Sequence, residues 1–89
     1  MKTKKGYTLR PLGQEYILVA EGLDVADATR MISMNATAAF LWEEVEDRDF
    51  DEQTLVDILI ENWNVSPETA KKDIAALLKS WRKAEVIVD

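Results

Sequence analysis

The first third of the chain has the hydrophobic patterns of β-strands. Residues 7–12 (YTLRPL) alternate apolar and polar positions, and residues 15–20 (EYILVA) are apolar and rich in β-branched side chains. Gly13 and Gln14 separate the two segments, which is the length of a tight hairpin turn in which glycine supplies a positive φ. Pro11 cannot donate a hydrogen bond to a neighbouring strand, so we expect the first strand to lie at a sheet edge.

A third strand is predicted at residues 30–34 (RMISM), after a loop at residues 21–27 that contains Gly22 and two aspartates. Side chains point alternately to the two faces of a strand, so Ile32 and Met34 should share one face. Because this strand follows a loop, we expect it to lie at an edge of the sheet. The alternative is that the chain's own tail or a second copy of the protein covers this edge.

The next two segments have helical periodicity, and a capping residue precedes each of them. Asn35 is a good N-cap for a helix over residues 36–46. Asp51 caps a second helix over residues 52–62, and Phe50 before it is placed to form a hydrophobic staple with the first turn. The expected buried faces of the two helices consist of Ala38, Leu41, Trp42 and Val45, and of Leu55, Ile58 and Leu59.

The clearest helix start is at Ser66 and Pro67, a capping serine followed by a proline at the first helical position. This third helix is expected to run to about Ala84, and residues 86–88 (VIV) to add a strand fragment or to pack on the core. Three strands followed by three helices predict an α+β fold of the winged helix-turn-helix kind, with a three-stranded antiparallel sheet, as a single domain over residues 1–89. The expected core is Ile17, Val19, Ile32, Met34, Leu41, Trp42, Leu55, Leu59, Ile74, Leu77 and Trp81.

The chain of 89 residues contains neither cysteine nor histidine. This composition excludes disulfides, thiolate metal sites and Cys–His nucleophile pairs, and it removes the usual general base at neutral pH. The acidic residues between positions 43 and 52 lack the spacing of a calcium loop with its central glycine, so we expect them to be solvated. We therefore expect a protein without enzymatic activity, metal or organic cofactor.

The net charge of −6 argues against a nucleic-acid binder, whose affinity rests mostly on neutralising phosphates. The five bases among residues 71–89 nevertheless leave a DNA-binding winged helix or a transcription regulator as the alternative function. No apolar segment long enough for a signal peptide or a membrane span follows the basic start of the chain. We expect a cytoplasmic protein that does not contact a membrane.

Several motifs of the chain occur in an order that is typical of one family. Residues 34–39 (MNATAA) join the third strand to the first helix through an apolar residue, an asparagine and a run of small residues. Further along the chain come Trp42, Val65, Asp73 with Ile74, Leu77 with Leu78, and Val86 with Ile87. Over nearly its whole length the sequence thus resembles the PqqD-like family, the small proteins of pyrroloquinoline quinone biosynthesis and their relatives. These are recognition elements in the biosynthesis of ribosomally made, post-translationally modified peptides.

Two positions depart from the pattern of this family. The family often has Asp-Gly after the first helix, where residues 47–49 of this chain read Asp-Arg-Asp. It also often has glycine before the final apolar pair, where this chain has Glu85. Glycine is the favoured residue just past a helix C-terminus, so we expect the third helix to end less sharply here.

The resemblance implies a non-catalytic protein that captures the leader segment of a precursor peptide. It would present this segment to a modifying enzyme, often one of the radical S-adenosylmethionine type. In the family the leader adds as a strand to the third strand and lies in a groove walled by the third helix, a recurring mode of peptide recognition. For this chain we expect a monomer or a weak dimer.

The candidate peptide-binding residues follow from this expected geometry. They are Arg30, Met31, Ile32 and Ser33 on the third strand and Lys71, Ala75, Leu78, Lys79 and Arg82 on the third helix. On the helix, Ala75 would leave space, Leu78 would offer apolar surface, and the bases would pair with acidic groups of the peptide. Two alternatives remain open. One is that these five positions of the third helix form an ordinary solvated face. The other is that the groove wall is the other flank of this helix, with Lys72, Ala76 and Lys83.

Overall fold

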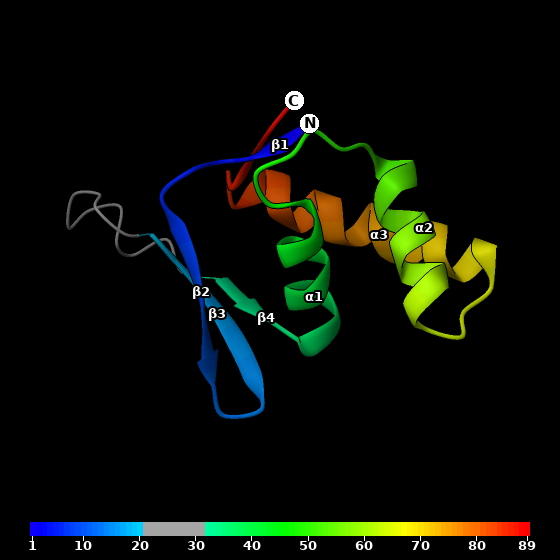
Figure 1. Cartoon of the computed structure of the whole chain (residues 1–89), viewed down its shortest axis with the longest axis horizontal. Coiled ribbons are helices and arrows are strands. Elements are labelled where there is room, and N and C mark those ends of the chain that lie inside the picture. Colours follow the sequence, from blue (N-terminus) through cyan, green and yellow to red (C-terminus); the bar gives the residue numbers. More distant parts are fainter. Residues whose placement is uncertain (21–31) are drawn as a thin grey trace.

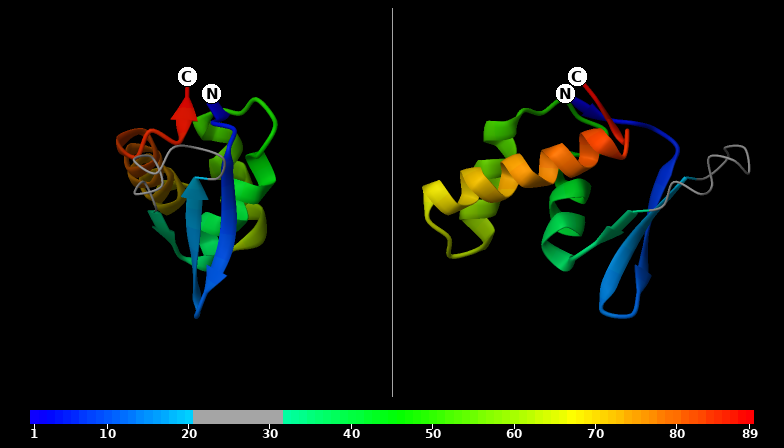
Figure 2. Two further views of the ribbon diagram at one scale, coloured as in Figure 1. Left: turned by 90° about the vertical axis from the view of Figure 1, so that its left-hand side faces the viewer. Right: turned by 180° about the vertical axis from the view of Figure 1, so that it is seen from behind.

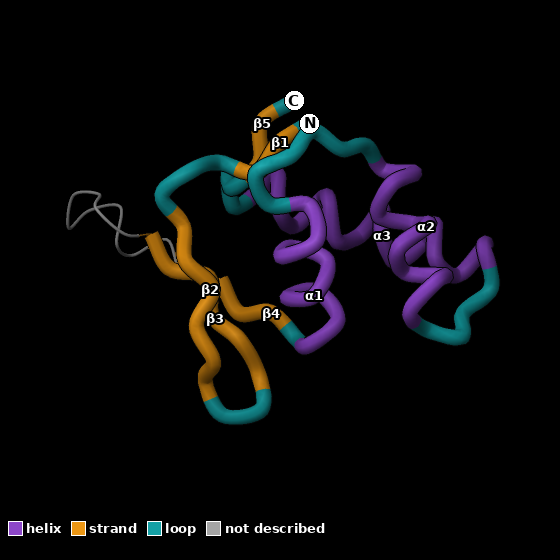
Figure 3. The backbone as a smooth tube through the Cα atoms, in the orientation of Figure 1, coloured by secondary structure: helices purple, strands orange, loops and turns teal. Residues whose placement is uncertain are grey.

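The computed structural model describes residues 1–20 and 32–89 (Figure 1). Its elements are β1 (Lys2–Thr3), β2 (Tyr7–Leu12), β3 (Glu15–Ala20), β4 (Ile32–Met34), α1 (Ala36–Val45), α2 (Glu52–Asn62), α3 (Pro67–Lys83) and β5 (Ile87–Val88). The sheet of β2, β3 and β4 stands at one end, with α1 beside it (Figure 3). Seen from behind, α3 crosses α1 and α2 (Figure 2). For the described residues, this arrangement confirms the predicted α+β fold, a three-stranded antiparallel sheet followed by three helices.

The sheet is built around the predicted hairpin. β2 and β3 are antiparallel and meet at Gly13, whose φ of 65° lies in the left-handed region. β4 pairs with the other side of β3, so the strand order is β2-β3-β4, with β2 and β4 at the edges. This order confirms the edge position expected for the first and third strands. Of the predicted third strand, Arg30 and Met31 lie outside the described residues, as does the predicted loop at residues 21–27.

The face of β3 that packs against the helices is not the predicted one. Leu18 lies directly opposite Ile32 of β4, and cross-strand partners point to the same face of a sheet. Leu18 is 0% exposed and Ala20 is buried, whereas Ile17 and Val19, the residues predicted for the core, remain partly exposed. Both faces of this strand are hydrophobic, so alternation within the strand does not identify the buried one. The pairing with β4 decides it.

The three predicted helix caps are confirmed. Asn35, Asp51 and Ser66 each accept a hydrogen bond from the backbone N–H three residues further on, at 2.8, 2.8 and 3.2 Å. Each side chain thus satisfies one of the backbone donors that a helix start leaves without an internal partner. Among the helices of the described residues, none has the length and the apolar character that a membrane crossing requires.

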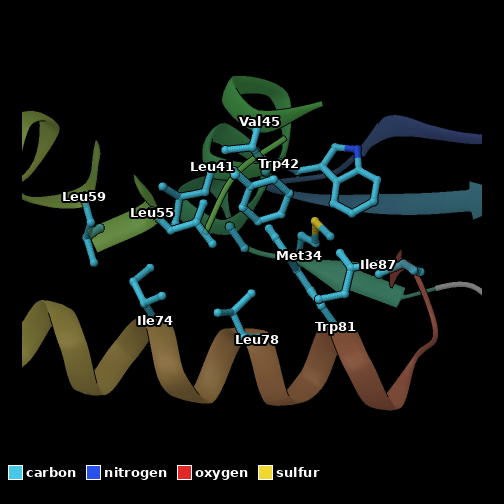
Figure 4. Close-up of a cluster of buried hydrophobic side chains, with 14 of the residues drawn as sticks. Met34, Leu41, Trp42, Val45, Leu55, Leu59, Ile74, Leu78, Trp81 and Ile87 are labelled. Atoms are coloured by element: carbon cyan, nitrogen blue, oxygen red, sulfur yellow. The ribbon is translucent and has the colours of Figure 1, made fainter. Parts of the chain in front are cut away.

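The hydrophobic core lies between the sheet and the helices, and side chains of α1, α2 and α3 converge in it (Figure 4). Trp42 of α1 and Trp81 of α3 are each 1% exposed and meet edge to face, with ring centroids 5.3 Å apart. Of the predicted core residues, Ile32 and Leu77 are only partly buried, as are Ile17 and Val19. Buried residues that the sequence analysis did not place in the core include Leu18, Phe50, Val56 and Leu78.

The C-terminal segment both packs on the core and forms a strand, which are the two outcomes expected for it. Val86 is buried, and β5 pairs antiparallel with β1, so that Lys2 lies opposite Val88 and Thr3 opposite Ile87. This pairing brings the two ends of the chain together (Figure 1). The sequence pattern does not predict β1, because two residues are too few to show a strand period.

α3 ends sharply, so the expectation drawn from Glu85 is wrong. Glu85 adopts a φ of 59° directly after the C-cap residue Ala84. Its N–H donates to the carbonyl of Arg82 at 3.1 Å, and the N–H of Val86 donates to the carbonyl of Trp81 at 3.2 Å. These two bonds form a Schellman motif, which usually has glycine at the position of Glu85. Backbone hydrogen bonds therefore close the helix even with a glutamate there.

Candidate functional site

A groove of about 450 Å³ lies between the edge strand β4 and the C-terminal half of α3. It is lined by Ile32, Ser33, Met34, Asn35, Ala38, Leu77, Ser80, Trp81, Lys83 and Ala84. Most of these side chains are apolar or small, and the volume falls within the range of pockets that bind small molecules. One wall of the groove is thus the edge of a sheet, and the other is a helix.

The floor of the groove belongs to the hydrophobic core. Met34, Ala38 and Trp81 are all buried, and Met34 of β4 lies over Trp81 of α3 (Figure 4). Asn35 turns the chain from β4 into α1, and its Oδ1 accepts the N–H of Ala38 at 2.8 Å. The cap therefore fixes the position of β4 relative to the start of α1, so this part of the groove is already formed in the folded protein.

The helical wall of the groove comes from one face of α3. Leu77, Ser80, Trp81 and Ala84 are spaced i, i+3, i+4 and i+7, which places them on the same side of the helix. Leu77 and Ala84 are half-buried, and Ser80 is exposed. The small side chains of Ser80 and Ala84 leave room beside β4, while Leu77 supplies apolar surface.

A second pocket, of about 360 Å³, continues the groove along α3. It is lined by Asn35, Thr37, Ala38, Leu41, Leu59, Asp73, Ile74 and Leu77. Asn35, Ala38 and Leu77 line both pockets, so the two pockets are neighbours along α3. The combined groove extends from Lys83 at the C-terminal end of α3 to Asp73 near its middle.

The candidate residues of the third strand lie at the groove as far as the structure describes them. Ile32 and Ser33 line it, whereas Arg30 and Met31 are outside the described residues. The assignment of Leu78 as apolar groove surface is wrong, because Leu78 is 1% exposed and belongs to the core. Leu77, which the sequence pattern places in the core, lines the groove instead.

The other candidate residues of α3 lie away from the groove. Lys71, Ala75, Lys79 and Arg82 are exposed, and none of them lines either part of it. Arg82 bonds through Nη2 to Oδ1 of Asp89 at 3.4 Å. The groove faces the opposite flank of the helix, the alternative that the sequence left open, and Lys83 is the member of that flank that lines it.

Sequence reasoning missed Ser80 and Ala84 on the helix and Asn35 and Ala38 at the start of α1. A signal for the first two was present, since they follow Leu77 at i+3 and i+7 and are small. No local pattern marks Asn35 as a groove residue, because its capping role explains it fully.

Two of the titratable groups that the structure describes have clearly shifted pKa values, and both lie at the junction of α1 and α2. Partial burial raises the pKa of Glu46, and the nearby carboxylates of Asp47 and Glu43 raise it further. Hydrogen bonds from the hydroxyl and the backbone N–H of Thr54 lower the pKa of Asp51. Within residues 1–20 and 32–89, no group of three or more acidic side chains is placed to hold a metal ion.

Comparisons with known proteins identify the family and the fold of the chain. The family model of coenzyme PQQ synthesis protein D (PqqD) matches residues 15–87. The solved structure of TbiB1 in complex with the TbiA(beta) leader peptide has the same fold, with a TM-score of 0.73, 16% sequence identity and complete coverage of both chains. No curated protein sequence matches the chain. Since the family model spans most of its length, the chain belongs to the PqqD family.

Proposed function

We propose that this protein is a non-catalytic binding protein that captures the leader segment of a precursor peptide. It presents this segment to a modifying enzyme of the radical S-adenosylmethionine type. The observation that carries the proposal is the edge strand β4 beside an apolar groove whose other wall is α3. Membership of the PqqD family supports it, and the similar fold of TbiB1 belongs to a protein that was solved with a leader peptide.

The edge of β4 supplies the backbone part of the binding. In the described part of the chain, β3 is the strand that pairs with β4, and the other side of β4 carries no strand. An extended peptide that adds there gains main-chain hydrogen bonds whatever its sequence. Ile32, Ser33 and Met34 therefore set the position of the peptide backbone rather than its sequence preference.

The pockets beside α3 supply the side-chain part of the binding. Side chains of an extended peptide alternate, so those on one face point into the groove towards Leu77, Ser80 and Ala84. Burial of an apolar side chain against this surface stabilises the complex by about 25 cal/mol per Å² of apolar area removed from water. The shape of this wall therefore determines which peptide sequences bind.

A pair of tryptophan substitutions on α3 tests the proposal. Ser80 lines the groove and Ala75 does not, yet both are exposed positions of the same helix. Ser80→Trp should fill the groove and weaken peptide binding at least tenfold, about 1.4 kcal/mol. Ala75→Trp should bind as the wild type does. The probes are synthetic segments of the short open reading frames next to this gene, titrated into ¹⁵N-labelled protein.

Amide shifts locate the binding surface in the same titration. We expect them to concentrate on residues 32–34 and 77–84. Shifts confined to α2 and the outer face of α1 would reject the groove even if a peptide bound. Equal affinities of the two tryptophan variants would reject it as well.

A further inference from the structure

The two ends of the groove carry opposite charges. Of the residues that line its two pockets, Asp73 is the acid and Lys83 is the base. Both side chains are exposed, and neither has an ion-pair partner among residues 1–20 and 32–89. Between them the lining is apolar, small or uncharged. A bound segment therefore meets a negative group at one end, apolar surface in the middle and a positive group at the other end.

The lining residues show that β4 leads from the first pocket towards the second. Ile32, at the start of β4, lines the pocket that also holds Lys83. Asn35, just after β4, lines this pocket and also the second pocket, which contains Asp73. A peptide that pairs with β4 therefore extends along α3, and its side chains pass Lys83, Leu77 and Asp73 in turn.

The spacing of these groups sets the spacing of the peptide residues that face them. Asp73 and Lys83 are ten positions apart on α3, which corresponds to about 15 Å along the helix axis. An extended peptide covers this distance in about four to five residues. Leu77 is four positions after Asp73, about 6 Å along the axis, which corresponds to about two peptide residues.

We propose, on the basis of the function proposed above, that the groove selects leader segments with a particular charge pattern. The segment carries a lysine or arginine at the Asp73 end, an apolar side chain over Leu77, and an aspartate or glutamate at the Lys83 end. Its two charged residues are about four positions apart, because side chains on one face of an extended peptide recur at every second residue. Each exposed ion pair contributes modestly, and its larger effect is to reject peptides with the opposite charge.

Selection from a displayed library of random twelve-residue peptides tests this inference. The baits are the full chain as wild type, Asp73→Lys and Lys83→Glu. Lys79→Glu is the matched control, since Lys79 is an exposed base of α3 that does not line the groove. The wild type and Lys79→Glu should enrich the same charge pattern. Selection on Asp73→Lys should enrich an acid in place of the base at the peptide position that faces residue 73, and at that position alone. Selection on Lys83→Glu should enrich a base in place of the acid at the position that faces residue 83.

Individual peptides from the selection give the size of the effect. A peptide with the wild-type pattern should lose about three- to tenfold in affinity for Asp73→Lys or Lys83→Glu. Restoring the opposite charge in the peptide should recover the affinity. Helix content measured by circular dichroism checks that the variants are folded.

The outcomes separate this inference from the proposed function. Suppose that the selected peptides bind the wild type and fail to bind Ser80→Trp. If these peptides then show no charge pattern, or a pattern that the charge variants leave unchanged, the inference alone would be overturned. If the wild type enriches no peptide more than an unrelated bait protein does, the proposed function fails and the inference fails with it. The same holds if Ser80→Trp still binds every peptide that the wild type selects.

Discussion

At the scale of single residues, the groove depends on which of two adjacent leucines faces it. Leu78 points into the core and Leu77 lines the groove, although the two are one position apart on α3. Neighbouring residues on a helix point about 100° apart, so the rotation of α3 about its own axis decides which of the two leucines faces the core. The buried neighbours Ile74 and Trp81 fix this rotation, because they hold the same face of the helix against the core.

Replacing Glu85 with glycine should stabilise the protein. Glu85 has a φ of 59°, and an L-residue in this region carries about 1 kcal/mol of strain that glycine avoids. Glu85→Ala is the control, since it removes the same carboxylate and keeps the Cβ. We expect Glu85→Gly to exceed Glu85→Ala in free energy of unfolding by about 1 kcal/mol in urea denaturation. Equal stabilities of the two variants would show that the left-handed conformation costs nothing here.

At the scale of elements, each helix start is held by its own residues. In α2, Asp51 accepts the N–H of Thr54, and the hydroxyl of Thr54 accepts the N–H of Asp51 at 3.3 Å. This reciprocal pair is a capping box with threonine in the place of the usual glutamate. α2 can therefore begin at the same residue whatever packs against it, and the same holds for α1 and α3 with their single caps.

The cap of α2 should make stability depend on pH in acid. The pKa of Asp51 is lowered in the folded state, chiefly by the Thr54 hydroxyl. The stability linked to this charge is fully present above the unfolded-state pKa and is lost as pH falls through the folded-state pKa. Asp51→Asn keeps an acceptor for the cap but has no charge. In urea unfolding, we expect the free energy of unfolding of the wild type to exceed that of Asp51→Asn at neutral pH. This difference should vanish in acid. A difference that persists unchanged in acid would contradict this.

At the scale of the whole molecule, the core and the groove share residues. Trp81 is buried against Trp42 and also forms part of the groove floor, as do Met34 and Ala38. We therefore expect sheet and helices to unfold as one unit, and a change at the centre of the core to alter the groove too. The pairing of β1 with β5 adds to this unit by tying the start of the chain to the segment that follows α3.

Truncation of Trp81 should be among the most damaging substitutions. Trp81 is 1% exposed, so Trp81→Ala should reduce the free energy of unfolding by about 3–5 kcal/mol. Trp63→Ala is the control, because Trp63 is only partly buried and meets Phe40 edge to face at 5.2 Å. We expect a clearly smaller loss for it in chemical denaturation. A loss below about 1 kcal/mol for Trp81→Ala would show that this side chain is not central to the core.

The sequence by itself determined the elements and their order, apart from the two-residue strand β1. The hairpin at Gly13 and the helix starts at Asn35, Asp51 and Ser66 were all predicted correctly, because each signal involves residues within about four positions of one another. The family could also be identified, since its motifs occur in linear order. A groove lies between the strand and the helix named by the sequence, and peptide binding there stays a prediction.

Only the tertiary structure decided which side of each element faces inward. Both faces of β3 are hydrophobic, and the pairing of Leu18 with Ile32 selects the buried one. Leu77 and Leu78 are equally apolar, and the packing of α3 selects Leu78 for the core. Where adjacent positions have similar hydrophobicity, periodicity contains no information about orientation. The orientation then comes from contacts between residues far apart in the chain.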